Sequence, residues 1–194
     1  MALNEQSDQR RRRRRSRKML LWFAMASIMM MFAGFTSAYV VSQSRKDWID
    51  NLGLPPIFIW STVAIFLSSI ALAFVKKSIL DHRRSRASLL LIIGFVLGIA
   101  FSTMQIIGFG DIVANGYYPA GSSSTINVSF YYVIIFMHLL HLLAGLIVLI
   151  VVIYNHFKER YKEGQTLGLE LGVTFWHFLD FVWLYLFFFI YFFG

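Results

Sequence analysis

The sequence contains no cysteine, and only 14% of its 194 residues are charged. Without cysteine there is no disulfide framework, no thiolate-ligated zinc and no iron–sulfur cluster. An ordinary soluble domain has about a quarter of its residues charged, so this chain has too few charges to cover a surface in water. The two shortages exclude a disulfide-rich secreted protein, an ordinary soluble enzyme and a disordered tail protein.

Long apolar runs take the place of the missing charges, and hydrophobic residues make up 58% of the chain. A helix needs roughly 20 apolar residues to cross a bilayer core, and lipid offers no partner for free backbone groups. We therefore predict an all-α integral membrane protein with five transmembrane helices, in which a basic tail at 1–18 precedes a membrane domain at 19–194. The helices are expected at about 19–41, 56–75, 87–109, 130–153 and 171–193, none of which contains Lys or Arg. Small residues such as Gly34, Gly94 and Gly98 predict close helix approach.

Basic residues gather on one side of this predicted bundle. The net charge is +8, and 16 of the 18 Lys and Arg residues fall before residue 19 or in the loops that follow the second and fourth predicted helices. The positive-inside rule then places the N-terminus in the cytoplasm and the C-terminus in the periplasm. We interpret the run Arg10–Arg15 as an anchor on the anionic inner leaflet and expect no nucleic-acid binding.

Ionisable residues inside the predicted helices are few, and each costs roughly 2.5–3.5 kcal/mol on insertion scales. His138 and His141 are three residues apart and share one helix face. His177 and Asp180 have the same spacing in the last helix, which has Glu170 at its inner end. The two pairs lie at similar depths, so we expect the polar faces of the fourth and fifth predicted helices to pair and hold the bundle.

Two further interpretations of these residues remain open. His138 and His141 could ligate haem or a metal, although two imidazoles on one helix face do not bracket a porphyrin. Asp180 supplies too few carboxylates for a di-metal site. His177 and Asp180 could instead relay protons in an independent channel or transporter. Structural packing, with bound lipid, is the interpretation that we favour, with no catalytic site and no metal site in this chain.

Two stretches resemble the cytochrome c oxidase subunit III family. Residues 136–145, FMHLLHLLAG, resemble its F-H-x-L-H-x-x-x-G helix. Residues 176–184, WHFLDFVWL, followed by YFFG at 191–194, resemble its last helix and C-terminus, and Gly168-Leu169-Glu170 is similar to the G-F-E that precedes that helix. Weaker similarity at 32–35, at 67–69 and at Gln105 extends the resemblance to all five helices.

The resemblance implies a noncatalytic subunit III of a bacterial haem–copper terminal oxidase, a part of aerobic electron transport in the inner membrane. Such a subunit packs against the catalytic subunit I and other oxidase subunits, which hold the haem and copper, and it binds phospholipid. An accessory subunit of a nitric oxide reductase is the alternative, and the electron donor, cytochrome c or quinol, stays open. The residues expected to hold the bundle, fill it or meet a phospholipid headgroup are His138, His141, Glu170, His177, Asp180, Trp176, Trp183, Lys158 and Arg160.

The chain departs from the family pattern at two positions. The first helix of the family usually has a buried Glu where this chain has Ile28, and the third often has a Glu where this chain has Gly108. Both intramembrane carboxylates are therefore missing. Their loss favours packing over a proton path that crosses the chain.

Overall fold

The structure is a computed structural model that describes residues 2–45, 48, 55–119, 121, 125–161 and 166–193. Within the first helix, it describes the side chains of residues 8 and 9 and of residue 11 onward. Lys162, which the charge pattern counts on the basic side, lies outside the described residues, as does most of the polar run that precedes the fourth predicted helix.

The described chain consists of helices and short connections. The helices are α1 (Ala2–Ser42), α2 (Ile57–Ala73), α3 (Val75–Leu80), α4 (Arg84–Ala114), α5 (Ile126–Phe157) and α6 (Leu167–Phe193). With α2 and α3 taken together, five helical segments are long and apolar enough to cross a membrane. The described residues contain no strand. For the described residues, the prediction of an all-α fold with five helices long and apolar enough to span a membrane is confirmed.

The helices run past the apolar boundaries at most ends, and the largest difference is in α1. The sequence predicted a helix from residue 19, whereas the helix begins at Ala2 and includes the basic tail. Arg, Lys, Gln and Leu are good helix formers, and water can satisfy the backbone beyond the lipid. The tail is therefore an extension of the first spanning helix along the same axis.

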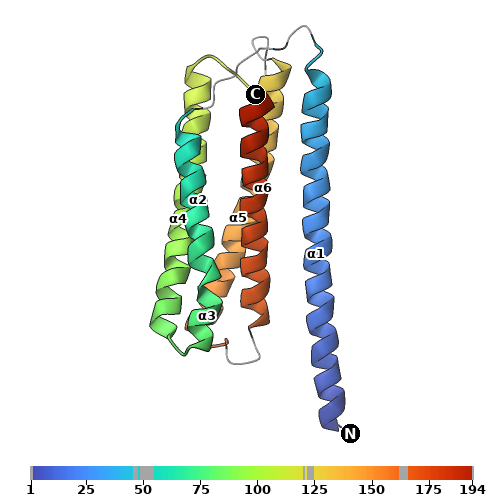
Figure 1. Cartoon of the computed structure of the whole chain (residues 1–194), viewed down its shortest axis with the longest axis vertical. Coiled ribbons are helices and arrows are strands. Elements are labelled where there is room, and N and C mark those ends of the chain that lie inside the picture. The colour runs from blue at the N-terminus through green and yellow to red at the C-terminus, as the bar shows by residue number, and fades with distance from the viewer. Residues whose placement is uncertain are drawn as a thin grey trace.

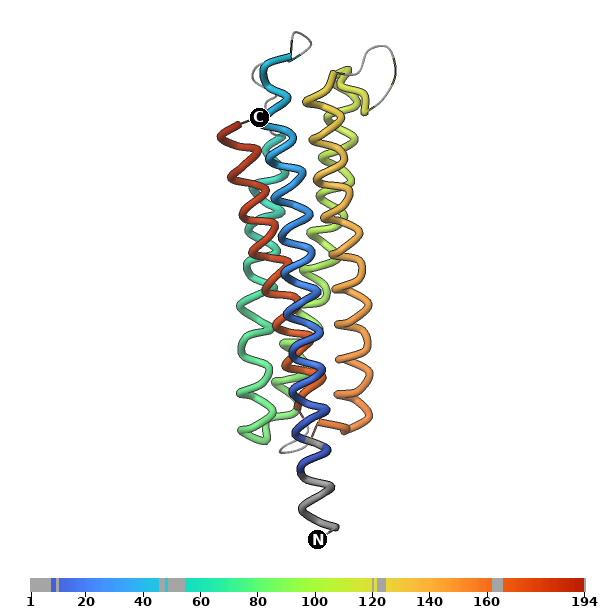
Figure 2. The backbone as a smooth tube through the Cα atoms, turned by 90° about the vertical axis from the view of Figure 1, so that its right-hand side faces the viewer, coloured from blue at the N-terminus to red at the C-terminus, as the bar shows by residue number. Residues whose placement is uncertain are grey.

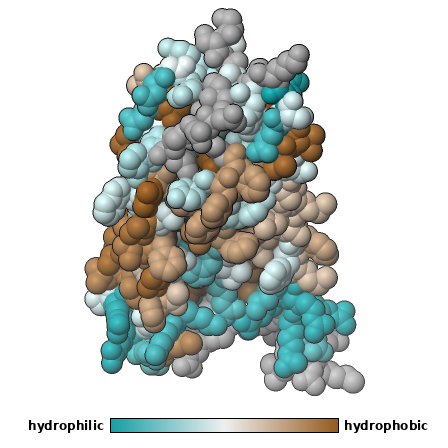
Figure 3. Space-filling model, turned by 45° about the horizontal axis from the view of Figure 1, so that its top comes forward, coloured by the Kyte–Doolittle hydropathy of each residue, from teal (hydrophilic) through white to brown (hydrophobic). Residues whose placement is uncertain are grey.

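Four helices form the main bundle, and α1 lies along one side of it. Figure 1 shows α2, α4, α5 and α6 together, with α1 set apart, and α1 makes its contacts with α5 and α6. The two termini lie at opposite ends (Figure 2). We call the end where α1 begins, α3 lies and α5 leads into α6 the basic end. In Figure 3, hydrophilic residues gather at this lower end, below an apolar band.

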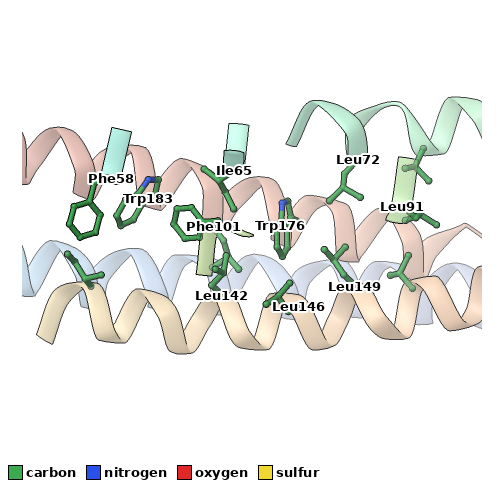
Figure 4. Packing of buried hydrophobic residues seen from close by; sticks show 14 of the residues in the cluster. Phe58, Ile65, Leu72, Leu91, Phe101, Leu142, Leu146, Leu149, Trp176 and Trp183 are labelled. Atoms are coloured by element: carbon green, nitrogen blue, oxygen red, sulfur yellow. The ribbon is translucent and has the colours of Figure 1, made fainter. Parts of the chain in front are cut away.

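A continuous apolar core runs the length of the main bundle. Its largest side chains are Trp176 and Trp183 of α6, which lie among Phe58, Phe101 and leucines from α2, α4 and α5 (Figure 4). A second, smaller cluster joins α1 to the bundle, and it consists of Phe32, Ile134, Val182 and Leu186. The core therefore lies within α2, α4, α5 and α6, and α1 adds one buried stripe to it.

Glycines on α4 let neighbouring helices approach closely. A Cβ at Gly98 would lie 2.5 Å from the Trp176 ring, and one at Gly94 would lie 2.7 Å from the Leu72 side chain. The prediction of close approach is confirmed at these two positions. It is wrong at Gly34 of α1, where a Cβ would have no neighbour within 4 Å.

Candidate functional site

A pocket of about 440 Å³ opens at the basic end between α1, α2–α3 and α6. We call it the basic pocket. Leu21 and Trp22 of α1 and Val173 of α6 contribute to its apolar wall. Its ionisable lining residues are Lys18, Lys76, Glu170 and His177. Two residues predicted from sequence, Glu170 and His177, thus share one pocket with an apolar wall and a cationic cluster.

Glu170 is the centre of that cluster. Its carboxylate lies 3.1 Å from the Lys76 Nζ, 3.2 Å from the Arg14 Nη2 and 3.4 Å from the Lys18 Nζ. The Thr166 hydroxyl donates to it at 3.1 Å. The Glu170 side chain is only 15% exposed, while its three cations are about half exposed. One carboxylate therefore joins α1, α3 and α6, and the cluster keeps a net positive charge.

His177 lies between this pocket and a buried carboxyl. Its Nδ1 is 2.5 Å from the Ser69 Oγ of α2 and 3.9 Å from the Asp180 Oδ2. Asp180 is 6% exposed, and neither carboxyl oxygen has a hydrogen-bond partner in the described structure. The polar pair on α6 therefore faces α2 and the pocket.

The two histidines of α5 do not meet this pair. The His141 Nδ1 bonds the backbone carbonyl of Met137 in its own helix at 2.7 Å. His138 is fully buried, and its ring packs against Trp183, Phe101 and Phe32 with neither nitrogen bonded in the described structure. The expected pairing of polar faces between α5 and α6 is wrong, because depth along a helix does not fix its rotation.

Close packing replaces that polar pairing. A Cβ at Gly145 of α5 would lie 2.7 Å from Leu179 and 3.4 Å from Trp176. Trp176 lies in the core, and the Trp183 Nε1 donates to the Thr62 Oγ1 on α2 at 2.9 Å. Both tryptophans therefore lie where α6 meets the other bundle helices.

Lys158 and Arg160 lie at the end of α5 and do not line the basic pocket. The Lys158 Nζ is 5.8 Å from the centre of the Tyr154 ring, and the Arg160 Nη1 donates to the Asn155 Oδ1 at 3.1 Å. The cations that do line the pocket are Lys18 and Lys76. Sequence reasoning did not predict that these two lysines pair with Glu170, and it also missed Ser69. The i, i+4 spacing of Arg14 and Lys18 on one helix face was a signal that could have been used.

The described residues contain no group of three or more His, Asp or Glu side chains arranged to hold a metal ion. His138 is enclosed by aromatic rings, and His141 is bonded to its own helix. The surroundings of these two imidazoles therefore do not fit a haem or metal site shared between them.

Comparison with known proteins gives a consistent match. A family model described as cytochrome c oxidase subunit III matches residues 18–194. Cytochrome bo(3) ubiquinol oxidase subunit 3 of Pseudomonas putida is 29% identical, over 84% of this chain and 75% of its own length. Cytochrome c oxidase subunit 3 of Spodoptera frugiperda is 25% identical, over 69% of this chain and 87% of its own. Cytochrome bo(3) ubiquinol oxidase subunit 3 of Buchnera aphidicola is 26% identical, over 88% of this chain and 83% of its own length. Residues before 18, including most of the basic part of α1, lie outside the family match.

Proposed function

Because the chain belongs to the cytochrome c oxidase subunit III family, we propose that it serves as the noncatalytic subunit III of a bacterial haem–copper terminal oxidase. The observation that carries the proposal is the family match, which spans the apolar part of all five helices. The relatives are named as subunits of oxidases that use cytochrome c or ubiquinol. These names favour an oxygen-reducing complex over a nitric oxide reductase.

In this proposal the chain packs against the catalytic subunit I and other oxidase subunits and stabilises them, while the haem and copper belong to its partners. The surroundings of its own histidines support this division. His138 is enclosed by aromatic rings, His141 is bonded to Met137, and His177 is bonded to Ser69.

We place the protein in the inner membrane with its basic end in the cytoplasm and its C-terminus in the periplasm. The positive-inside rule supports this orientation, because 16 of the 18 basic residues belong to segments at that end. The structure adds that α1 continues past the apolar segment as a helix that carries Arg11–Arg15. Such a helix can interact with the anionic headgroups of the inner leaflet.

The basic pocket is the proposed phospholipid site. Lys18 and Lys76 offer cationic groups to a phosphate, while Leu21, Trp22 and Val173 offer an apolar wall to an acyl chain. The net positive charge of the Glu170 cluster supports an anionic headgroup. This assignment moves the expected headgroup contact from Lys158 and Arg160 to the pocket between α1 and α6.

Affinity purification of the tagged chain from its native membrane tests the proposal. We expect it to co-purify with a haem-bearing complex that reduces oxygen with reduced cytochrome c or a quinol. Recovery of the chain alone, or of a complex that reduces nitric oxide and not oxygen, would contradict it.

For the lipid site, we expect the double variant K18Q/K76Q to lower the phospholipid phosphorus bound per complex. The matched variant K158Q should leave it unchanged.

A further inference from the structure

Asp180 is a buried carboxyl that the proposed packing role does not require. It lies in the middle of α6 and is 6% exposed, and neither of its oxygens has a hydrogen-bond partner in the described structure. An ionised carboxylate without a partner is far more costly to bury than a neutral carboxylic acid. Its burial therefore favours a bound proton on Asp180 within the folded chain.

A short polar connection leads from Asp180 to the basic pocket. His177 lines that pocket, and its side chain is 36% exposed. Its Nδ1 lies 3.9 Å from the Asp180 Oδ2, which is too long for a direct hydrogen bond. The Ser69 hydroxyl lies 2.5 Å from that same nitrogen, so the Ser69 and Asp180 side chains both lie on the Nδ1 side of the ring. Ser69 is therefore placed to bridge the two residues.

The connection allows a balanced proton transfer. A hydronium ion in the pocket gives its proton to the His177 ring and becomes water. The imidazolium then donates its Nδ1 proton to the Ser69 oxygen, while the Ser69 hydroxyl proton passes to the Asp180 carboxylate. The ring ends neutral, the serine is regenerated, and the carboxyl holds the one proton that entered.

The opposite side of Asp180 is closed by aromatic packing. Trp183 lies one turn further along α6 and is 1% exposed, and its ring centre is 5.0 Å from Phe101 and 6.3 Å from Phe58. Its Nε1 is already bonded to Thr62. His138, which packs on the same ring, is fully buried. These rings pack about one turn beyond Asp180 toward the end opposite the basic end, and we infer that they close that side of the carboxyl.

Other polar and charged groups lie on α6 and on the helices around it. They are Lys18 on α1, Lys76 two turns beyond Ser69, Glu170 on α6, His138 on α5, and Gln105 on α4, whose amide donates to Ser61. The His177 ring is only partly exposed, and burial disfavours a lasting positive charge on it. His177 is then a transient carrier, and Asp180 is where the proton stays.

From this geometry we propose that His177, Ser69 and Asp180 form a proton-binding site that exchanges with the basic end alone. The site stores one proton on Asp180 and does not conduct protons across the membrane. It is independent of the lipid assignment, because it does not require an occupied pocket. It is also compatible with the absence of the two carboxylates that the family usually has where this chain has Ile28 and Gly108.

Infrared spectroscopy of the purified complex tests whether Asp180 holds a proton. We expect the wild-type complex to show the C=O stretching band of a protonated carboxylic acid, which shifts in D₂O and disappears in D180N. The variant E159Q removes an exposed carboxylate outside the site and should keep the band. A spectrum that is unchanged in D180N would overturn the proposal. Should D180N not assemble, D180E keeps a carboxyl at the position and should shift the band, and an unshifted band in D180E would overturn the proposal.

The route is tested by the rate at which that band exchanges its proton for deuterium. We expect S69A and H177F to slow the exchange several-fold. S68A, which removes a neighbouring α2 hydroxyl bonded to the Gly94 carbonyl, should leave the rate unchanged. Equal rates in the wild type, S69A and H177F would refute the route.

In proteoliposomes, D180N should leave passive proton permeability unchanged, and a lower permeability would refute the claim that the site is closed on one side.

Discussion

Helix α1 and the bundle of α2, α4, α5 and α6 are held in place in different ways. In α1, 17% of the most apolar stretch is buried inside the chain, against 28–39% in the other four spans. Its buried residues, Met25, Phe32, Thr36 and Tyr39, form a single stripe at helical spacing. The bundle helices instead bury large side chains against two or three neighbours each.

Polar contacts therefore matter more for α1 than for the bundle. They occur at three heights along the helix: the Glu170 cluster, the pair of Thr36 and Tyr185 hydroxyls 2.7 Å apart, and the Tyr39 hydroxyl 3.3 Å from the Phe193 carbonyl. In lipid there is no hydrophobic force between apolar helices, so close packing and hydrogen bonds decide their association. The bundle relies mainly on packing, and α1 relies on a narrow stripe and these contacts.

The largest effect is expected from Trp176→Ala in the bundle. The variant leaves a cavity beside Gly98 and Gly145. Replacing a buried tryptophan by alanine lowers the free energy of unfolding by about 3–5 kcal/mol. We expect a lower denaturant midpoint and less folded protein in the membrane. Trp60→Ala is the matched control, because Trp60 is 68% exposed, and it should change neither. Equal losses in the two variants would show that the bundle is not held by close packing.

A smaller loss is expected from Gly98→Ala. The added methyl group would meet the Trp176 ring at 2.5 Å, and overpacking of this kind costs about 1–3 kcal/mol. In Gly34→Ala on α1, the added methyl group meets open space. Because alanine favours the helix more than glycine does, the thermal midpoint of this variant should stay level or rise. If both variants lost the same stability, the contrast between α1 and the bundle would not hold.

The sequence predicted the number and type of the helices because lipid leaves few alternatives. Twenty apolar residues without charge must form a spanning helix, whatever its neighbours are. The boundaries were less predictable, since a count of apolar residues stops where the lipid stops. Helix α1 begins at Ala2 and α4 ends at Ala114, both beyond the apolar segments. A helix can continue past the lipid because its backbone hydrogen bonds also form in water.

Sequence reasoning found three residues of the candidate site and missed the residues that pair with them. Glu170, His177 and Asp180 were conspicuous because ionisable residues are rare in spanning helices. Their partners were missed because serine and terminal basic residues are common in such helices; these partners are Ser69, Arg14, Lys18 and Lys76. The rotation of α6 about its axis decides that His177 faces α2 and not α5, and that rotation depends on the fit of Leu179 and Trp176 against Gly145.

Glu170→Gln tests the polar contact of α1 at the basic end. The variant removes a charge that faces Arg14, Lys18 and Lys76, and partly exposed ion pairs of this kind contribute up to about 1 kcal/mol each. We expect faster hydrogen exchange in the first half of α1, with little change in the bundle. High salt screens the same ion pairs and should speed the exchange of α1 in the wild type as well. Glu159→Gln, which removes the partner of Arg84, is the control and should leave α1 unchanged. Unchanged exchange in Glu170→Gln would show that the stripe alone holds α1 there.

The smallest effect is expected at the Thr36–Tyr185 contact. Hydrogen bonds between membrane helices contribute about 0.6 kcal/mol on average, because each group finds other partners when the helices separate. Thr36 already has such a partner, since its hydroxyl also lies 3.0 Å from the Phe32 carbonyl in α1. A double-mutant cycle of Thr36→Val and Tyr185→Phe should therefore give a coupling near that value. A coupling of zero would leave α1 dependent on Phe32 packing and the Glu170 cluster. A coupling several times larger would make this single contact the main attachment of α1.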